Sequence, residues 1–262
     1  MHVTLDLAQN FYCVISGVIV GFSLGLIGGG GSILAVPLLL YFVGVTDPHV
    51  VIGTTALAVS LNAFIDLIPH ARAGNVRWRP ATRFAVAGVI GAFAGAELGK
   101  IVNGTYLLIF FGILMLWVAY SMYQHRNQQP VSQQNVCKRK GCVYGYGAGV
   151  GILSGFFGIG GGFLIVPALM RSVKLPILNA VASSLLAVGA LGMATAISYS
   201  WDGLVDWRIA GEYLLGGIAG GWIGAKVAEL LGHKKALLND IFIIVIVIVA
   251  FYMLFKEASL LL

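Results

Sequence analysis

The stretch GLIGGGGSILAVP, residues 25–37, places four consecutive glycines inside one of the most apolar regions of the chain. Of the 262 residues, 59% are hydrophobic and 10% are charged, whereas a typical soluble domain carries about 25% charged residues. Apolar runs of roughly 20 residues, the length that crosses a bilayer as a helix, recur along the whole sequence. The composition therefore predicts an all-α polytopic membrane protein that is embedded in the lipid bilayer and has no nucleic-acid partner.

The glycine motif occurs a second time as GFFGIGGGFLIVP, residues 155–167, at an offset of 130 residues. Downstream the match continues at an offset of 129, where Thr54–Thr55 falls on Ser183–Ser184 and Gly74 falls on Gly203. So many matches in one frame predict an internal duplication.

The duplication predicts two transmembrane repeats, residues 1–123 and 141–262, joined by a polar linker at 124–140. The first apolar segment of each repeat, roughly 11–44 and 142–173, is too long for one span. Thirty-odd helical residues would reach about 50 Å, against a hydrocarbon core of about 30 Å. Because the glycines lie near its middle, each first segment is expected to form a re-entrant hairpin or two spans, followed by three further transmembrane helices.

The distribution of basic residues favours one orientation of these repeats. If each first segment returns to the side from which it entered, each repeat crosses an odd number of times, and the two repeats are inverted. With the linker inside, all of the 16 Lys and Arg residues except Lys100, Arg208 and Lys256 lie inside, as the positive-inside rule favours. We therefore predict two inverted-topology repeats in the cell inner (plasma) membrane, with the linker cytoplasmic and both termini outside.

The duplicated glycines predict a binding site for an anion. Broken backbone at membrane depth must be buried in protein or line a wet cavity. A helix that restarts there, near Ser32 and near Phe163, offers free N–H groups and a partial positive charge. Inverted repeats would bring the two sites together near the midplane. The alternative is that the glycines serve close helix packing, which is our interpretation of Gly88, Gly91 and Gly95.

The expected substrate-binding residues are the glycine motifs and the duplicated hydroxyl pairs: Gly28, Gly29, Gly30, Gly31, Ser32, Thr54, Thr55, Gly158, Gly160, Gly161, Gly162, Ser183 and Ser184. Hydroxyls can donate to the oxygens of an anion, or they can bond back to a helix carbonyl. Asn62 and His70 are possible gating residues.

The remaining ionisable residues indicate no catalytic or coupling site. Asp66, Glu97, Glu212 and Glu229 all fall near predicted segment ends and are interpreted as boundary residues, so no carboxylate is expected to carry a proton at mid-membrane. Net transport is therefore expected to run outward without a coupled ion. No enzyme activity, metal or cofactor is expected, because the motifs of zinc proteases, serine hydrolases and P-loop NTPases are missing.

The duplicated pattern consists of GLIGGGGSILAVPLLL followed by GTTAL, and GFFGIGGGFLIVPALM followed by ASSLL, with GNVRWR and GLVDWR after them. It resembles the sulfite exporter TauE/SafE family over nearly the whole chain. The resemblance implies a secondary permease that exports small sulfur-containing anions, such as sulfite, sulfoacetate or other organosulfonates. An anion-binding membrane sensor or structural subunit without transport, and a coupled importer of a carboxylate or sulfonate, are the alternatives. A monomer and a homodimer both remain open.

Overall fold

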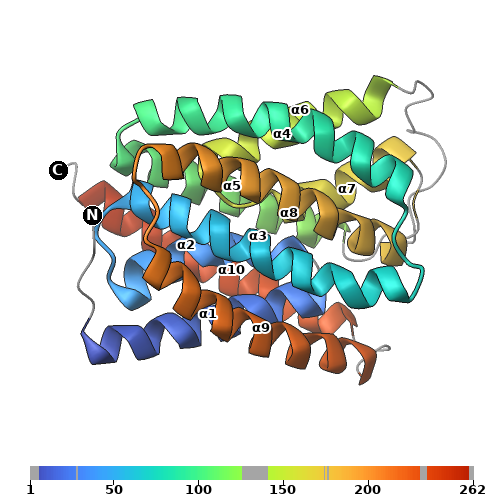
Figure 1. Cartoon of the computed structure of the whole chain (residues 1–262). Coiled ribbons are helices and arrows are strands. Elements are labelled where there is room, and N and C mark those ends of the chain that lie inside the picture. The colour runs from blue at the N-terminus through green and yellow to red at the C-terminus, as the bar shows by residue number, and fades with distance from the viewer. Residues whose placement is uncertain are drawn as a thin grey trace.

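The structure, a computed structural model, is a bundle of helices (Figure 1). It describes residues 6–27, 29–125, 141–173, 175, 177–230 and 235–259. In chain order the elements are α1 (Leu7–Ile27), the 3-10 helix η1 (Gly29–Leu34), α2 (Ala35–Pro37), the π-helix η2 (Leu38–Val43), α3 (Pro48–Arg72), α4 (Trp78–Ile101), α5 (Gly104–His125), α6 (Gly141–Phe157), α7 (Gly162–Val173), α8 (Ile177–Trp201), α9 (Trp207–Leu230) and α10 (Lys235–Ser259). The described residues contain no β-strand, and the all-α prediction is confirmed.

Six of these helices, α1, α3, α4, α5, α8 and α10, are long and apolar enough to cross a membrane. The bundle also exposes large apolar side chains on its outer faces, among them Ile90, Trp222 and Phe255. Lipid covers such surfaces at no cost, whereas a soluble protein rarely exposes so many. The prediction of a multi-pass membrane protein is confirmed.

An aspartate starts one long helix in each half, and equivalent glycines follow the ends of α3 and α8. The two aspartates are not equivalent in the repeat, because the counterpart of Asp206 is Arg77. The Asp47 carboxylate accepts hydrogen bonds from two backbone N–H groups at the start of α3, and the Asp206 carboxylate does the same at the start of α9. Both are N-caps that satisfy otherwise unpaired N–H groups. Gly74 and Gly203, with φ of 71° and 70°, follow the ends of α3 and α8, where a left-handed residue ends a helix.

Each long first segment doubles back at its glycines. In the first half, α1 has 21 residues, and the shorter limb of η1, α2 and η2 returns from it. In the second half, α6 has 17 residues and α7 has 12. At 1.5 Å per residue α7 is about 18 Å long, which is too short for a core of about 30 Å. The helix lengths therefore favour a re-entrant hairpin over two full spans.

The first helix of each half packs on the other half. α1 lies parallel to α9, and α6 lies parallel to α4. Glycines make both contacts close: a Cβ on Gly21 would overlap the carbonyl group of Gly217, and a Cβ on Gly151 would overlap that of Gly88. Gly91 and Gly95 contact the α6 backbone in the same way. The interpretation of the regularly spaced glycines as packing residues is thus confirmed.

The directions of the helices are consistent with inverted repeats. α3 and α8 cross at the centre of the bundle and run in opposite directions (Figure 1). α1 and α9 run with α3, whereas α4 and α6 run with α8, so each of these six helices opposes its counterpart in the other half. The described chain starts and ends at one end of the bundle, and α5 ends and α6 begins at the opposite end (Figure 1).

Candidate functional site at the glycine turns

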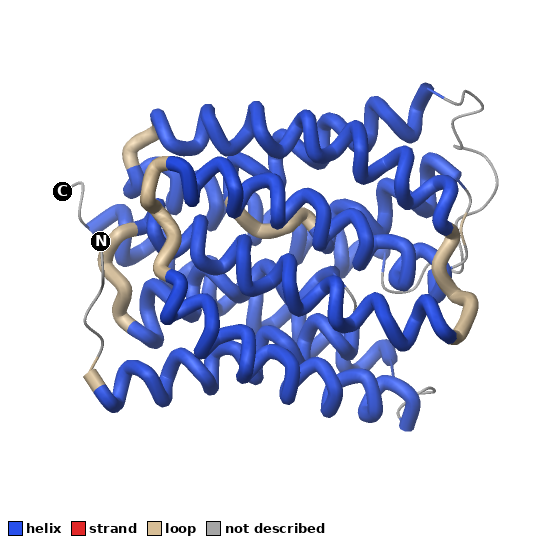
Figure 2. Tube along the Cα trace, in the orientation of Figure 1, coloured by secondary structure: helices blue, strands red, loops and turns tan. Residues whose placement is uncertain are grey.

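The second glycine motif forms a buried turn between α6 and α7. Gly158, Gly160 and Gly161 have φ of 67°, 66° and 67°, a left-handed conformation that glycine adopts without a steric penalty. All three residues are buried. In Figure 2 this turn is the loop that lies midway along the bundle. Its non-helical backbone is therefore enclosed in protein, as the membrane requires.

The turn is wedged between α3 and α8. A Cβ on Gly160 would lie 3.1 Å from Cγ1 of Val188 on α8 and 3.6 Å from Cγ1 of Val59 on α3. A Cβ on Gly158 would overlap the side chain of Ile52 on α3. Val59 and Val188 are close to the middle of their 25-residue helices. The turn thus lies near the middle of the bundle.

Helix α7 begins directly after this turn, at Gly162, one residue before the expected start at Phe163. Leu164 and Ile165 donate its first hydrogen bonds, both to the carbonyl of Gly161, at 2.9 and 3.0 Å. The N–H groups before Leu164 have no helical partner. Together with the helix dipole they favour a negatively charged ligand.

Ser154 on α6 adds a hydroxyl that sequence reasoning missed. Its side chain is buried and its Oγ has no hydrogen-bond partner. The Oγ lies 3.2 Å from the position that a Cβ on Gly161 would take. The equivalent residue in the first half is Leu24, so the repeat offered no signal for it.

The first glycine motif has a different backbone. Gly28 lies outside the described residues, and Gly29–Leu34 forms the 3-10 helix η1. The expected α-helical start near Ser32 is therefore absent, and α-helix begins only at Ala35. Gly31 approaches α1 so closely that a Cβ would lie 2.8 Å from the Cβ of Ser23. η1 also packs against α7 and α8, which brings the two glycine motifs together.

One hydroxyl of each pair bonds back to its own helix. Thr55 Oγ1 donates to the carbonyl of Val51 at 2.7 Å, and Ser184 Oγ donates to the carbonyl of Val181 at 2.8 Å. Each residue lies one turn before the valine of its helix that contacts Gly160. Both hydroxyls therefore lie on the faces that flank the glycine turn, with their protons directed to backbone in this state.

The other hydroxyl of each pair joins the two halves. The N–H of Asp206 donates to Thr54 Oγ1 at 3.0 Å, and the N–H of Arg77 donates to Ser183 Oγ at 2.9 Å. The two bonds are equivalent at the offset of 129. Each holds the start of α9 or α4 against the central helix of the opposite half.

Two polar side chains of α3 face the glycines of α9 without partners. Asn62 is 1% exposed, and neither its amide nitrogen nor its amide oxygen forms a hydrogen bond. One turn further, Asp66 lies beside Gly221, and its Oδ2 is buried without a partner. The interpretation of Asp66 as an ordinary boundary residue was therefore wrong, because one oxygen is held inside the bundle. His70 lies in the last turn of α3 and is half-buried.

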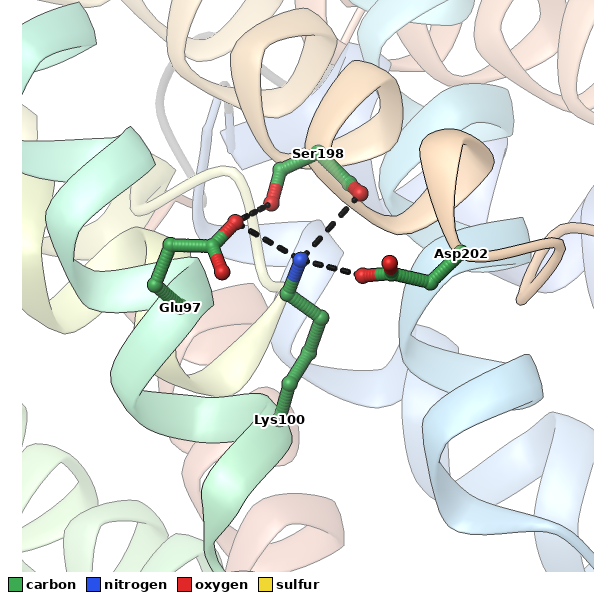
Figure 3. Close-up of polar contacts among 4 residues, drawn as sticks. All are labelled: Glu97, Lys100, Ser198 and Asp202. Carbon is green, nitrogen blue, oxygen red and sulfur yellow. Dashed lines mark hydrogen bonds and ion pairs between the residues drawn. The ribbon is translucent and has the colours of Figure 1, made fainter.

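Charges at the end where the chain starts are paired. Lys100 Nζ contacts Glu97 Oε1 at 2.7 Å, the carboxylate of Asp202, and the carbonyl of Ser198 at 3.3 Å (Figure 3). The Ser198 hydroxyl donates to Glu97 Oε1 at 2.9 Å (Figure 3). This network joins α4 of the first half to α8 of the second.

The opposite end carries unpaired cations. Among the described residues, no ion pair involves the exposed arginines at the end of α3 and the start of α4, namely Arg72, Arg77, Arg79 and Arg83. By contrast, Arg208 at the first end pairs with Glu212 at 3.2 Å. The arginine-rich end therefore has a positive potential that attracts anions.

The glycine turn is closed to the outside in this structure. Two grooves of about 220 and 230 Å³ lie elsewhere, one lined by Tyr41 and Tyr252 and the other by Leu57 and Trp207. No described glycine of either motif lines these two grooves, and Gly158, Gly160 and Gly161 are buried. Within the described part of the chain, no group of three His, Cys, Asp or Glu side chains could hold a metal ion.

Residues 13–253 match the family model described as sulfite exporter TauE/SafE. The chain belongs to this family. A probable membrane transporter protein of Xylella fastidiosa (strain 9a5c) is 48% identical over 244 residues, which cover 92% of this chain and 94% of that protein. The probable membrane transporter protein YunE of Bacillus subtilis is 29% identical, with 90% and 93% covered. No solved structure matches. As a TauE/SafE member, the chain is a membrane transporter.

Proposed function

We propose that this TauE/SafE protein is a permease for small sulfur-containing anions, such as sulfite, sulfoacetate or other organosulfonates. The proposal rests above all on the buried left-handed turn at Gly158–Gly161, which leads directly into the N-terminus of α7. Free N–H groups at a helix N-terminus favour an anion, and glycine lets it approach the backbone closely. Ser154 adds a buried hydroxyl without a partner.

Both motifs contribute to the proposed site. η1, Gly29–Leu34, packs against α7, so the first motif approaches the helix that follows the second motif from the other half. Thr55 and Ser184 bind the anion when their hydroxyls rotate away from the helix carbonyls. Thr54 and Ser183 fix the two halves relative to each other at the site, because their hydroxyl oxygens accept hydrogen bonds from backbone N–H groups at the starts of α9 and α4. Asn62 and His70 act in gating.

Transport then follows from the inversion of the two halves. The closed site opens to one side when one half moves against the other, and to the opposite side by the equivalent movement. The free arginines at the linker end gather anions at that mouth. If the anion crosses alone, an inside-negative potential favours its exit by about 2.3 kcal/mol per charge for each 100 mV.

The orientation in the membrane is part of the proposal. Residues 124–140 and the loop at 70–80 lie in the cytoplasm, and both termini lie on the outer, non-cytoplasmic side of the inner membrane. The unpaired arginines at the linker end support this orientation. Single cysteines at Asn75 and Ser259, probed with a membrane-impermeant maleimide on intact cells, test it. Labelling at Ser259 but not at Asn75 is expected, and the reverse result contradicts the proposal.

A flux panel tests the function itself. The purified protein is placed in liposomes loaded with one unlabelled anion, and entry of the same ³⁵S-labelled anion is followed for sulfite, sulfoacetate, isethionate, taurine and sulfate. We expect protein-dependent exchange of at least one sulfonate or of sulfite, with the anion recovered chemically unchanged. Thermal stabilisation by a sulfonate without any exchange would instead support the anion-binding sensor, and a chemically altered anion would support an enzyme.

A further inference from the structure

One face of α3 connects the glycine turn to Asp66. Ile52, Thr55, Val59, Asn62 and Asp66 follow one another at intervals of three and four residues, which places them on one face of the helix. We call these five residues the α3 stripe. Ile52 and Val59 contact the glycine turn between α6 and α7. The last two residues of the stripe contact the glycines of α9.

The last two residues of the stripe carry buried polar atoms that the fold leaves unsatisfied, although Asp66 as a whole is half-buried. Both amide atoms of Asn62 and the Oδ2 of Asp66 lack hydrogen-bond partners. A Cβ on Gly217 would lie 2.6 Å from Asn62 Cγ, and one on Gly221 would lie 2.9 Å from Asp66 Oδ1. A buried polar group without a partner costs about 1–3 kcal/mol, so this arrangement is not explained by stability.

The second half shows that packing does not require polar residues here. The equivalent stripe on α8 is Val181, Ser184, Val188, Leu191 and Thr195. Leu191 occupies the position of Asn62 and packs against Gly88, the counterpart of Gly217. Thr195 occupies the position of Asp66 and satisfies its hydroxyl on the carbonyl of Leu191 at 3.1 Å. The polar pair is therefore specific to the first half.

Few other charges lie near Asp66. Of the elements packed most closely against α3, namely α1, α2, η2, α5, α8 and α9, only α9 contains Asp, Glu, Lys or Arg. On α9, Arg208 pairs with Glu212 at the far end, and the Lys226 ammonium lies 4.0 Å from the centre of the Trp222 ring. Glu229 follows in the last turn of α9.

Tyrosine and cysteine side chains occur on the other neighbouring elements, namely Tyr12 and Cys13 on α1, Tyr41 on η2, Tyr106, Tyr120 and Tyr123 on α5, and Tyr199 on α8. Further titratable groups lie on α3 itself and on the glycine face of α9. His70 and Arg72 follow Asp66 in the last turns of α3, and Tyr213 lies two turns before Gly221 and is buried. Among the described residues, neither a hydrogen bond nor an ion pair joins Asp66 to any of these groups. The carboxylate therefore lacks a compensating positive charge.

A proton fits this site better than a metal ion. Asp66 and Asn62 offer few side-chain oxygens, and the facing residues Gly217 and Gly221 add none. Ions such as calcium take six to eight oxygen ligands, whereas a proton needs only the carboxylate. Asp66 is also six residues from the end of α3 at Arg72, about 9 Å along the axis, so protons have a short path from that end.

We propose that Asp66, with Asn62 beside it, is a proton-binding site whose loading is coupled to anion binding at the glycine turn. The coupling part rests on the proposed function. Asp66 is seven residues from Val59, about 10 Å along the helix axis, and Val59 contacts the turn. At an effective dielectric constant of about 20, two like charges about 10 Å apart weaken each other's binding by roughly an order of magnitude.

Protonation of Asp66 removes that repulsion, so proton and anion bind together and cross together. A monovalent anion that carries one proton moves without net charge. The membrane potential then contributes nothing, and the direction of transport follows the two concentration gradients. A proton gradient directed inward would drive uptake, and export would require an anion gradient larger than the opposing proton gradient.

The coupling is tested in proteoliposomes with isethionate, whose sulfonate stays ionised across the pH range used. A pH gradient of one unit, acid outside, is imposed while valinomycin and equal potassium concentrations hold the potential at zero. With one proton per anion, wild type accumulates the label up to about tenfold. Asp66→Asn reaches no more than the outside concentration, and its isethionate exchange no longer depends on pH.

Two further variants distinguish a loss of coupling from a loss of folding. Asn62→Leu combined with Asp66→Thr reproduces the Leu191 and Thr195 pair, which the protein already packs against a glycine face, and it shows the same loss of accumulation. Glu212→Gln removes an acid of α9 that lies away from both sites and accumulates isethionate like wild type. Accumulation by Asp66→Asn equal to that of wild type overturns the proposal.

Failure of the coupling and failure of the transport function give different results. Exchange of isethionate in wild type without any response to the pH gradient, or accumulation driven only by a Na⁺ gradient, overturns the coupling and leaves the permease intact. No exchange of any anion overturns the permease. The proton site is then read directly by infrared difference spectra between acid and alkaline pH, in which wild type shows a protonated carboxyl band that Asp66→Asn lacks. A band of equal size in both proteins overturns the site.

Discussion

The two halves of the molecule share a scaffold but differ at the positions that face the proposed site. The stops Gly74 and Gly203, the glycine contacts of α1 with α9 and of α6 with α4, and the hydrogen bonds that Thr54 and Ser183 accept are all repeated. The glycine motifs are not, because one forms a left-handed turn and the other a 3-10 helix.

The two central helices show the same contrast. Their stripes carry similar side chains near the glycine turn and then differ, with Asn62 and Asp66 on α3 and Leu191 and Thr195 on α8. Repeated contacts supply packing, and a symmetric scaffold suits a carrier that opens to either side. A coupled ion needs only one site, so the departure from symmetry is where we place the coupling chemistry.

The largest effect is expected from closing the glycine turn. Gly160→Leu places a side chain against Val188 and Val59 and covers the N–H groups proposed to bind the anion. Losing two charge-assisted hydrogen bonds of about 1.5–3 kcal/mol each lowers affinity by about a hundredfold or more. Anion exchange should fall to background while the protein remains in the membrane. Gly30→Leu should abolish exchange as well, with a smaller loss of stability, because the 3-10 helix does not require a left-handed residue.

Two controls separate the site from general damage. Gly203 has φ of 70° and no atom within 4 Å of the position of a Cβ, so Gly203→Leu introduces the backbone strain without filling the turn. Gly149 on α6 also has open space around it, and Gly149→Leu tests the added apolar volume. Both variants should transport. Normal exchange by Gly160→Leu and Gly30→Leu would show that the glycines serve packing alone.

The second prediction exchanges one residue between the stripes. Asn62→Leu removes two unpaired amide atoms and introduces the side chain that already packs in this position on α8. We expect the protein to become more stable by about 1–3 kcal/mol, seen as a higher melting temperature in detergent, while proton-driven accumulation falls. Destabilisation by this substitution would show that Asn62 has a structural partner in the native membrane.

Much of this architecture could be predicted from the repeat. The duplicated frame located the breaks in both first segments, the position of α7 and the pairs Thr54–Thr55 and Ser183–Ser184. Hydrophobicity and glycine spacing are local properties that survive in each copy, so they indicate the helices and their packing faces. The packing of η1 on α7 is consistent with inverted repeats, which the charge distribution predicts.

The asymmetric features could not be obtained in this way. Gly29–Leu34 and the equivalent residues of the second half have nearly the same composition, and only tertiary contacts decide between a 3-10 helix and a left-handed turn. Asp66 is close to a helix end in the sequence, which suggested exposure to water. The burial of its Oδ2 depends on the fold, in which Asp66 lies beside Gly221 of α9. Ser154 has no counterpart in the first half and gave no signal.

The third prediction concerns a contact that the two halves do share. Thr54→Val leaves the N–H of Asp206 without its acceptor, and Ser183→Ala does the same to Arg77. Asp206 is 3% exposed, whereas Arg77 is exposed, so water can replace the lost partner only at Arg77. We expect a loss of about 1–3 kcal/mol for Thr54→Val and about 0.5–1 kcal/mol for Ser183→Ala, measured by thermal unfolding. Equal losses would show that exposure does not decide the cost.

The smallest effect is expected from the charges near the ends of α4 and α9, which lie at opposite ends of the bundle. Those of α4, at the end where the chain starts, pair with the other half. Lys100 on α4 bridges to Asp202 beyond α8 (Figure 3), whereas Lys226, the counterpart of Glu97, lies over Trp222 of its own helix. Lys100→Met should cost no more than about 1 kcal/mol, because the Glu97 and Asp202 side chains are 60% and 52% exposed and regain water.

Because this contact joins the two halves, weakening it by about 1 kcal/mol should favour opening at that end, and exchange should rise by up to about fivefold. The gain should vanish at about 1 M salt, where screening acts within about 3 Å and weakens the wild-type contact as well. Lys226→Met, which breaks no bridge between the halves, should leave exchange at the wild-type rate, and a similar gain in both variants would locate the effect in surface charge rather than in the bridge.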